Sequence, residues 1–289
     1  MHPTGHPHMP TSLPSHLQIN FIPATSPFTP TTPDSWKCTS WIKQQNCKQS
    51  KDITLSLINT TNQQDWDLIL IQEPYIYPRS QLTLASQHWY TLYPSQDPDD
   101  CNLPHSLILI STKLTSISFT QIHITSHVIM ALSLTQAGTN IDIYNIYKPP
   151  NTDMALWHLQ SWLSAHPTGH DSSTIWARTS TSTTCCGEAQ IKLNDAYAAM
   201  LTSLCSCLLN TMELQLPAGT PTFKFNSHHT WTTLNRFFCN SDLTHHILSC
   251  DTSPDDHLPA VDHLPIHTWI DVELNKHQTT LGCNFKNAD

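Results

Sequence analysis

Side chains that can bind ligands through charge and hydrogen bonds recur where regular segments of this chain begin or end. Asn46, Glu73 and Tyr147 each close such a segment, Asn235 stands at the start of one, and the pair Asp262-His263 immediately precedes the last. In α/β folds, ligands bind in the crevice at the carboxyl ends of the strands. The sequence therefore predicts a shared binding rim, built from polar residues that are far apart in the chain.

Glu73 is at the centre of this prediction. It follows the apolar run from Leu68 to Ile71, whose length is typical of a strand buried on both faces. Pro74 cannot continue a central strand, and it favours an extended backbone at Glu73. We therefore expect a carboxylate where a buried strand emerges. The alternative for this residue taken alone is a solvated loop glutamate, because glutamate is mostly exposed in proteins.

The pattern of short β segments interrupted by a few helices predicts an α/β fold. We expect strands over 41–46, 65–73, 89–92, 106–111, 116–122, 127–134, 140–147, 173–177, 234–239 and 264–272, and helices over 52–62, 153–164 and 192–212. The first strand, helix and strand form a right-handed crossover unit. The middle strands succeed one another without helices, which favours a four-layer α/β sandwich of two packed mixed sheets flanked by helices.

Composition divides the chain into three parts. Residues 1–40 form a tail rich in Pro, Ser, Thr and His, which we expect to be disordered because it cannot bury enough apolar surface. Residues 41–274 form the folded domain, and residues 275–289 form a polar C-terminal tail. The net charge is −9 and only 12% of residues are charged, so nothing indicates the clustered Lys and Arg of a tight nucleic-acid binder.

The cysteine pattern and the absence of long apolar runs indicate the compartment. No C-x-x-C pair occurs, so we expect no structural zinc site. No signal peptide and no apolar run long enough to span a membrane are visible. We therefore expect an intracellular protein with free thiols and no membrane partner.

Six short motifs occur in a distinctive order over about residues 40–272. They are Q-Q-N at 44–46, L-I-Q-E-P at 70–74, N-I-Y-K-P at 145–149, G-T-P-T-F at 219–223, T-T-L-N-R-F-F at 232–238 and D-H-L-P-I at 262–266. In this order they resemble the endonuclease/exonuclease/phosphatase superfamily. More closely, the chain looks like the apurinic-type endonuclease domain of fungal non-LTR retrotransposons.

The resemblance implies a phosphodiester hydrolase that nicks DNA with Mg²⁺ (or Mn²⁺). It assigns the metal to Glu73, supported by Asn46, since hard cations prefer oxygen ligands. Its catalytic set corresponds here to Tyr147, which contacts the phosphate or leaving group, to His263, which hydrogen-bonds the phosphate, and to Asp262, Asn145 and Asn235. Asp262 would orient the imidazole of His263. The implied partners are DNA, bound weakly, and a reverse transcriptase domain absent from this chain, in a nuclear setting.

Three departures from the pattern predict weak or absent activity. A Gly-Asp-Phe-Asn motif is expected just after the strand that ends at Ala177, but residues 178–187 contain no carboxylate. A shifted reading frame across these codons can encode Asp-Phe-Asn-Leu-His-His-Leu-Leu-Trp, which suggests a local frame disruption. Asn235 stands where Asp is usual, and Val261 stands where Ser is common. Loss of a positioned water and base removes several orders of magnitude of rate.

Three functions are compatible with these observations. The first is a Mg²⁺-dependent DNA-nicking domain with a degenerate site. The second is a remnant or binding module that keeps only the fold. The third is a phosphatase of the same superfamily acting on inositol lipids or sphingolipids, which short loops between the motifs and the lack of basic pocket residues disfavour.

Overall fold

The structure is a computed structural model that describes residues 39–95, 101–136, 139–149, 152, 154–166, 173–180, 212–217, 219–225, 230–258 and 261–276. The predicted tails lie outside these ranges, except for residues 39–40 and 275–276. The helix predicted over 192–212 also lies outside them, except for Met212, which begins a strand.

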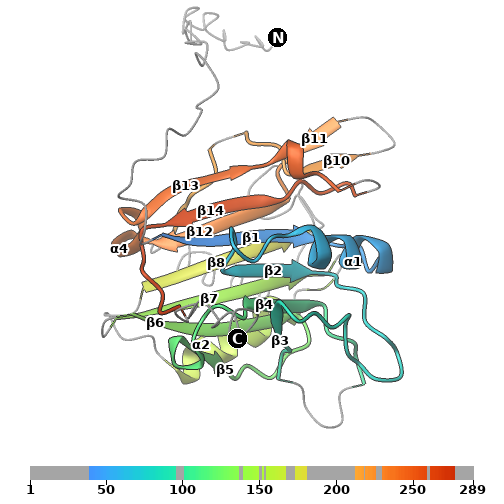
Figure 1. The fold of residues 1–289 in the computed structure, drawn as a ribbon, viewed down its shortest axis with the longest axis horizontal. Coiled ribbons are helices and arrows are strands. Elements are labelled where there is room, and N and C mark those ends of the chain that lie inside the picture. The colour runs from blue at the N-terminus through green and yellow to red at the C-terminus, as the bar shows by residue number, and fades with distance from the viewer. Residues whose placement is uncertain are drawn as a thin grey trace, which may run out of the picture. The chain divides into compact units, whose positions relative to one another are not determined.

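Two six-stranded sheets form the body of the fold (Figure 1). The first contains, in spatial order, β13 (Ile247–Thr252), β14 (Ile266–Ile270), β1 (Ser40–Asn46), β2 (Leu68–Gln72), β4 (Ser106–Ser111) and β3 (Trp89–Leu92). The second contains β5 (Phe119–Ile122), β6 (Ile129–Gln136), β7 (Thr139–Lys148), β8 (Ser173–Ser180), β12 (Asn235–Asn240) and β9 (Met212–Leu214). A separate ribbon pairs β10 (Phe223–Phe225) with β11 (Thr230–Thr232).

Both sheets are mixed, because each contains one crossover through a helix. β1 and β2 are parallel and joined by α1 (Lys51–Thr60), while β7 and β8 are parallel and joined by α2 (Met154–Ala165). The other pairs within the two sheets are antiparallel. The other helical elements among the described residues are η1 (Ser116–Ser118), α4 (Ser241–Thr244) and η3 (Pro254–Asp256).

The core lies between the sheets, and α1 and α2 each cover an outer face. Leu68 and Leu70 of β2 join the main core cluster, whereas Ile69 and Ile71 pack in the cluster that contains Leu57 of α1. The run from Leu68 to Ile71 is therefore buried on both faces, as its composition predicted, and each such side chain stabilises the fold by about 1.5–3 kcal/mol. On the other sheet, α2 contributes to a third cluster. The predicted four-layer α/β sandwich is confirmed.

Several local predictions need correction. Residues 116–118 form a 3₁₀ turn, and only Phe119–Ile122 pair as a strand. β8 continues three residues past Ala177, because Thr179 and Ser180 pair with Tyr147 and Lys148 of β7.

Some elements were not predicted at all. The strands β9, β10, β11 and β13 escaped the sequence patterns, three of them because they are only three residues long. Within the described ranges, no helix is both long enough and apolar enough to cross a membrane.

Candidate active site

Glu73 and Tyr147 join the two sheets at one rim. Glu73 follows the last residue of β2 in the first sheet, and Tyr147 lies next to the end of β7 in the second. The Tyr147 hydroxyl donates a hydrogen bond of 2.5 Å to Oε1 of Glu73. Burial, followed by the bond to Glu73 and its charge, raises the pKa of the Tyr147 phenol well above its usual range. The phenol therefore keeps its proton and acts as a donor at neutral pH.

The backbone of Glu73 differs from the extended conformation that Pro74 predicted. Its φ is +46°, in the left-handed region, which a non-glycine residue adopts at a cost of about 1–3 kcal/mol. Two main-chain hydrogen bonds hold it there: Glu73 N donates to His105 O at 2.9 Å, and Gln49 N donates to Glu73 O at 2.7 Å. These bonds, made at the end of β2, override the local preference set by the proline.

Asn46 lies beside the end of β2, because its Cα pairs with that of Gln72. The side chain is fully buried, and its Oδ1 accepts a hydrogen bond of 2.9 Å from the backbone N of Lys48. Its Nδ2 is buried and has no hydrogen-bond partner among the residues that the structure describes. A buried unpaired donor is uncommon, and it is suited to an acceptor such as a phosphate oxygen or a water molecule.

Asn145 lies one layer deeper than Tyr147 and holds the sheets together. Its Nδ2 donates to the carbonyls of Ile71 and Leu107, at 2.9 and 2.8 Å, and its Oδ1 accepts from Nε2 of Gln72 at 2.5 Å. Gln72 was part of a quoted motif but had no predicted role. The contacts of both amides are internal, so these two residues position the rim from below.

His263 makes the second contact between the sheets. Its imidazole is almost fully buried, and Nδ1 lies 3.0 Å from Oδ1 of Asn235, at the start of β12. An amide oxygen only accepts, so the Nδ1 of His263 carries a proton in this pair. Asp262, the group expected to orient the imidazole, has its Oδ1 3.8 Å from Nε2, which is too far for a hydrogen bond. Its Oδ2 pairs instead with Nζ of Lys48 at 2.7 Å.

Burial lowers the pKa of His263 to about 4, with an opposing contribution from Asp262 and a smaller lowering by Lys48. The imidazole is therefore neutral at pH 7. With its proton on Nδ1, a neutral His263 presents a lone pair at Nε2, so this atom accepts rather than donates.

The predicted residues form one contiguous group. Nε2 of Gln45 donates to the carbonyls of both Asn46 and His263, at 2.9 and 3.2 Å. On the second sheet, the Cα of Thr179 pairs with Tyr147 on one side and with Asn235 on the other. The rim thus runs through Glu73, Tyr147, Thr179, Asn235, His263 and Asn46.

Thr179 occupies the place where the resemblance expects the Gly-Asp-Phe-Asn motif. It lies within β8, it is fully buried, and its hydroxyl has no hydrogen-bond partner in the described part of the chain. The chain therefore has a neutral side chain between Tyr147 and Asn235. Most of the segment proposed to be frame-disrupted, from residue 181 on, lies outside the described residues.

Among the described carboxylates at the rim, Asp262 is in an ion pair with Lys48 and Glu73 is not. Glu73 is therefore the carboxylate that a divalent cation could bind. Among the described residues, no three His, Cys, Asp or Glu side chains are grouped so that they could hold a metal ion. Mg²⁺ usually keeps several waters and uses one or two carboxylates together with substrate phosphates. The rim fits such a cation, because Glu73 has a second carboxylate oxygen beside the one that accepts from Tyr147.

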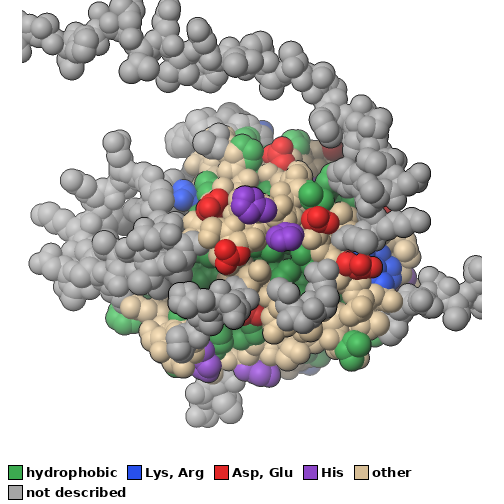
Figure 2. All heavy atoms as spheres, turned by 90° about the vertical axis from the view of Figure 1, so that its left-hand side faces the viewer, with side chains coloured by type: hydrophobic (Ala, Val, Ile, Leu, Met, Phe, Trp, Pro, Cys, Tyr) green, Lys and Arg blue, Asp and Glu red, His purple; other side chains and the backbone are tan. Residues whose placement is uncertain are grey.

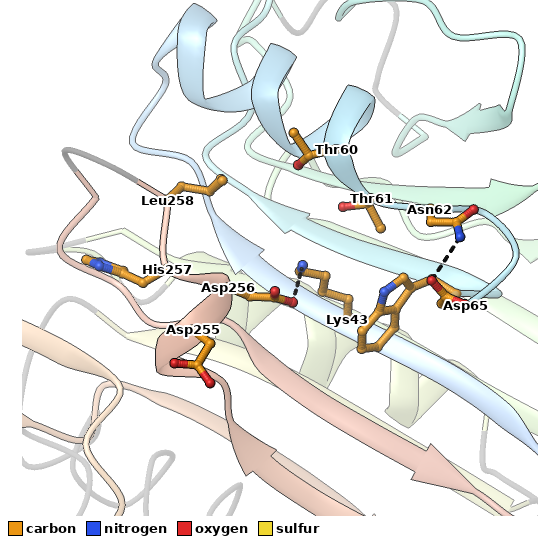
Figure 3. A pocket seen from close by; sticks show the side chains of 10 residues that line it. Lys43, Thr60, Thr61, Asn62, Asp65, Asp255, Asp256, His257 and Leu258 are labelled. Atoms are coloured by element: carbon orange, nitrogen blue, oxygen red, sulfur yellow. Dashed lines mark hydrogen bonds and ion pairs between the residues drawn. The ribbon is translucent and has the colours of Figure 1, made fainter. Parts of the chain in front are cut away.

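A cavity of about 380 Å³ lies apart from this rim, between α1 and η3 on the outer side of β1 (Figure 3). Within this cavity, Nζ of Lys43 forms an ion pair with Asp256 at 3.1 Å. The same atom lies 5.4 Å from the centre of the Trp66 ring. None of the predicted site residues lines the cavity. We interpret these contacts as a structural ion pair that attaches the loop preceding Asp262 to the first sheet.

The described surface at the end of the molecule that carries α4 is rich in acidic side chains and histidines (Figure 2). Figure 2 shows acidic side chains and histidines close together there, with lysine and arginine only towards the margins of the described surface. This end includes Asp242 in α4 and the following His245 and His246. Such a surface repels a phosphate backbone at neutral pH.

Comparison with known proteins shows similarity in structure only. No protein-family pattern and no curated protein sequence matches the chain. Among solved structures, the endonuclease domain of TRAS1, a telomere-specific non-LTR retrotransposon, superposes with a TM-score of 0.59 at 16% identity, covering 80% of this chain and 98% of that domain. The catalytic domain of APE2 from Xenopus laevis gives 0.58 at 10% identity, covering 82% and 94%. The AP endonuclease LMAP from Leishmania major gives 0.58 at 11% identity, covering 88% and 93%.

Two of the three comparison proteins are named as endonucleases, and each of the three matches over most of its length. The resemblance that the six motifs predicted is confirmed at the level of the fold: the chain shares its fold with the TRAS1 endonuclease domain, the APE2 catalytic domain and the AP endonuclease LMAP.

Proposed function

We propose that this chain is a phosphodiesterase that nicks DNA with a divalent cation, as the endonuclease domain of a non-LTR retrotransposon. The observation that carries the proposal is the pair of hydrogen bonds that cross between the sheets at one rim, from Tyr147 to Glu73 and between His263 and Asn235. The fold shared with the TRAS1 endonuclease domain supports it. A reverse transcriptase partner and a nuclear location follow from the same resemblance and stay predictions.

Phosphodiester hydrolysis needs charge neutralisation at the phosphate, a positioned water and help for the leaving oxygen. In this proposal Glu73 holds Mg²⁺ (or Mn²⁺), which supplies Lewis-acid polarisation of the phosphate when bound. The Nδ2 of Asn46, which is buried and has no hydrogen-bond partner among the described residues, is a further donor at the same rim. Tyr147 keeps its proton, and while its ring stays in place beside Glu73, its O–H bond can turn from the carboxylate to a phosphate or leaving oxygen.

The same rim supports the prediction that activity is weak. Thr179 has no charge with which to position a water, and Asn235 cannot stabilise a protonated His263 as a carboxylate would. A neutral imidazole with its lone pair at Nε2 does not donate to a phosphate oxygen. The competing function, a remnant that keeps only the fold, is favoured by these two positions.

A plasmid-nicking assay tests the proposal. We expect slow conversion of supercoiled to open-circular DNA in Mg²⁺, none in EDTA, and none with Glu73→Gln, which keeps the size of the side chain but removes its charge. Glu273→Gln is the matched control, because Glu273 is exposed and follows β14. No nicking by the folded wild-type chain in either Mg²⁺ or Mn²⁺ supports the remnant, and nicking that survives Glu73→Gln contradicts the proposed site.

A further inference from the structure

His105, a residue for which the motifs gave no role, contacts both members of the Glu73–Tyr147 pair. It immediately precedes β4, and its carbonyl accepts the hydrogen bond from Glu73 N that helps to hold the left-handed backbone. Its imidazole stacks on the Tyr147 ring, with 5.3 Å between centroids and 16° between planes. One residue therefore contacts the donor by its side chain and the acceptor by its main chain.

His105 is itself anchored on its other side. Its backbone N donates to the carbonyl of His127 at 2.7 Å, and the two imidazole rings lie 5.9 Å apart. Tyr147 is tied to the same segment, because its backbone N donates to Val128 O at 2.9 Å. The segment His127–Val128 thus fixes both stacked residues relative to each other.

We propose that His105 is a positioning residue, whose ring holds the Tyr147 phenol on the carboxylate of Glu73 in the orientation that the phosphodiesterase site requires. This inference rests on the proposed function for its catalytic consequence, but the geometric part concerns the fold alone. A phenol hinged at its Cβ can swing away from its acceptor, and a flat neighbour parallel to the ring restricts that motion. Misplacement of a catalytic group by an ångström costs about a hundredfold in rate.

The titratable and charged groups near the His105 imidazole are His127, Glu73 and Tyr147. Burial, then His127, lowers the pKa of His105, against a smaller raising by Glu73. The ring is therefore neutral at pH 7, and it contacts Tyr147 as an uncharged aromatic surface. We therefore expect a flat apolar ring at this position to keep the contact with Tyr147, and a small side chain to lose it.

Kinetics of three variants test the catalytic consequence. We expect His105→Ala to lower kcat for nicking about ten- to a hundredfold with little change in KM, and His105→Phe to restore most of the loss. His88→Ala is the control, because His88 is an exposed histidine in the turn before β3. Equal losses in His105→Ala and His105→Phe, or a loss confined to KM, would overturn the proposal.

A double-mutant cycle tests the positioning even if the chain does not nick DNA. The coupling between Tyr147→Phe and Glu73→Gln is measured from urea unfolding in the wild-type, His105→Ala and His105→Phe backgrounds. We expect the coupling to fall by more than half with His105→Ala and to persist with His105→Phe. An unchanged coupling with His105→Ala rejects the positioning role. If the coupling changes as expected but the wild-type chain does not nick DNA, only the proposed function is rejected.

Discussion

The imidazole of His263 faces an amide, not a carboxylate: Nδ1 lies 3.0 Å from Oδ1 of Asn235, and both side chains are buried. The amide fixes the tautomer and orients the ring, but it does not stabilise the charged form. Asp262, the adjacent carboxylate, is paired with Lys48 instead. Burial is therefore the main influence on the pKa of His263, and it favours the neutral imidazole.

Replacing Asn235 by Asp should raise the pKa of His263 from about 4, because a carboxylate within hydrogen-bonding distance favours the imidazolium. The expected result is a shift of the His263 titration towards neutral pH, measured by NMR, together with about tenfold faster nicking. Asn62→Asp adds the same charge at an exposed position and serves as the control. A His263 titration that does not move would show that the amide is not its controlling partner.

Replacing Thr179 by Asp should restore a carboxylate between Tyr147 and Asn235. We expect faster Mg²⁺-dependent nicking, because a charged oxygen at this position can hold the attacking water. The variant should also be less stable by several kcal/mol without metal, since the side chain is fully buried, and should recover part of this loss in Mg²⁺. Thermal unfolding with and without Mg²⁺ measures the second effect, and Thr179→Asn separates charge from size.

Removing the hydroxyl of Tyr147 should weaken the junction between the sheets. Tyr147→Phe loses the 2.5 Å bond to Glu73 and should lower the free energy of unfolding by about 1–3 kcal/mol, because the acceptor is charged. Urea unfolding measures this, with Tyr90→Phe as the control, since Tyr90 is half exposed in β3. Equal stability of Tyr147→Phe and the wild-type chain would mean that the bond is not formed in solution.

Acid should destabilise the fold through two buried histidines. Burial lowers the pKa of both His263 and His267 to about 4, below the ordinary value of 6.5. The unfolded chain therefore binds more protons, so this contribution is fully present above about pH 6.5 and is lost as the pH falls to 4. Each histidine accounts for on the order of 3 kcal/mol at most. We expect the urea concentration at the midpoint of unfolding to decrease as the pH is lowered from 7 to 4.5. The decrease should be smaller in His267→Gln.

The sequence by itself determined much of the architecture. Apolar runs such as Leu68–Ile71, closed by Pro74, favour a buried strand, and the observed β2 lies within the predicted range. β3 and β4 have the predicted bounds, and β1 begins one residue earlier than predicted. The order of the six motifs was sufficient to indicate the fold, because each motif ends or begins an element whose position in the sandwich is fixed by that order.

Only the tertiary structure decided how the polar groups pair. Asp262 is next to His263 in the chain, yet the imidazole forms its hydrogen bond with Asn235, because β12 places Asn235 beside His263 from the other sheet. Pro74 predicted an extended Glu73, but hydrogen bonds from two distant loops hold it left-handed. His105 carries no motif, and its stacking on Tyr147 depends on two strands that meet only in the folded chain. Periodicity records which face of an element is buried, whereas pairing between distant side chains depends on how the sheets are stacked.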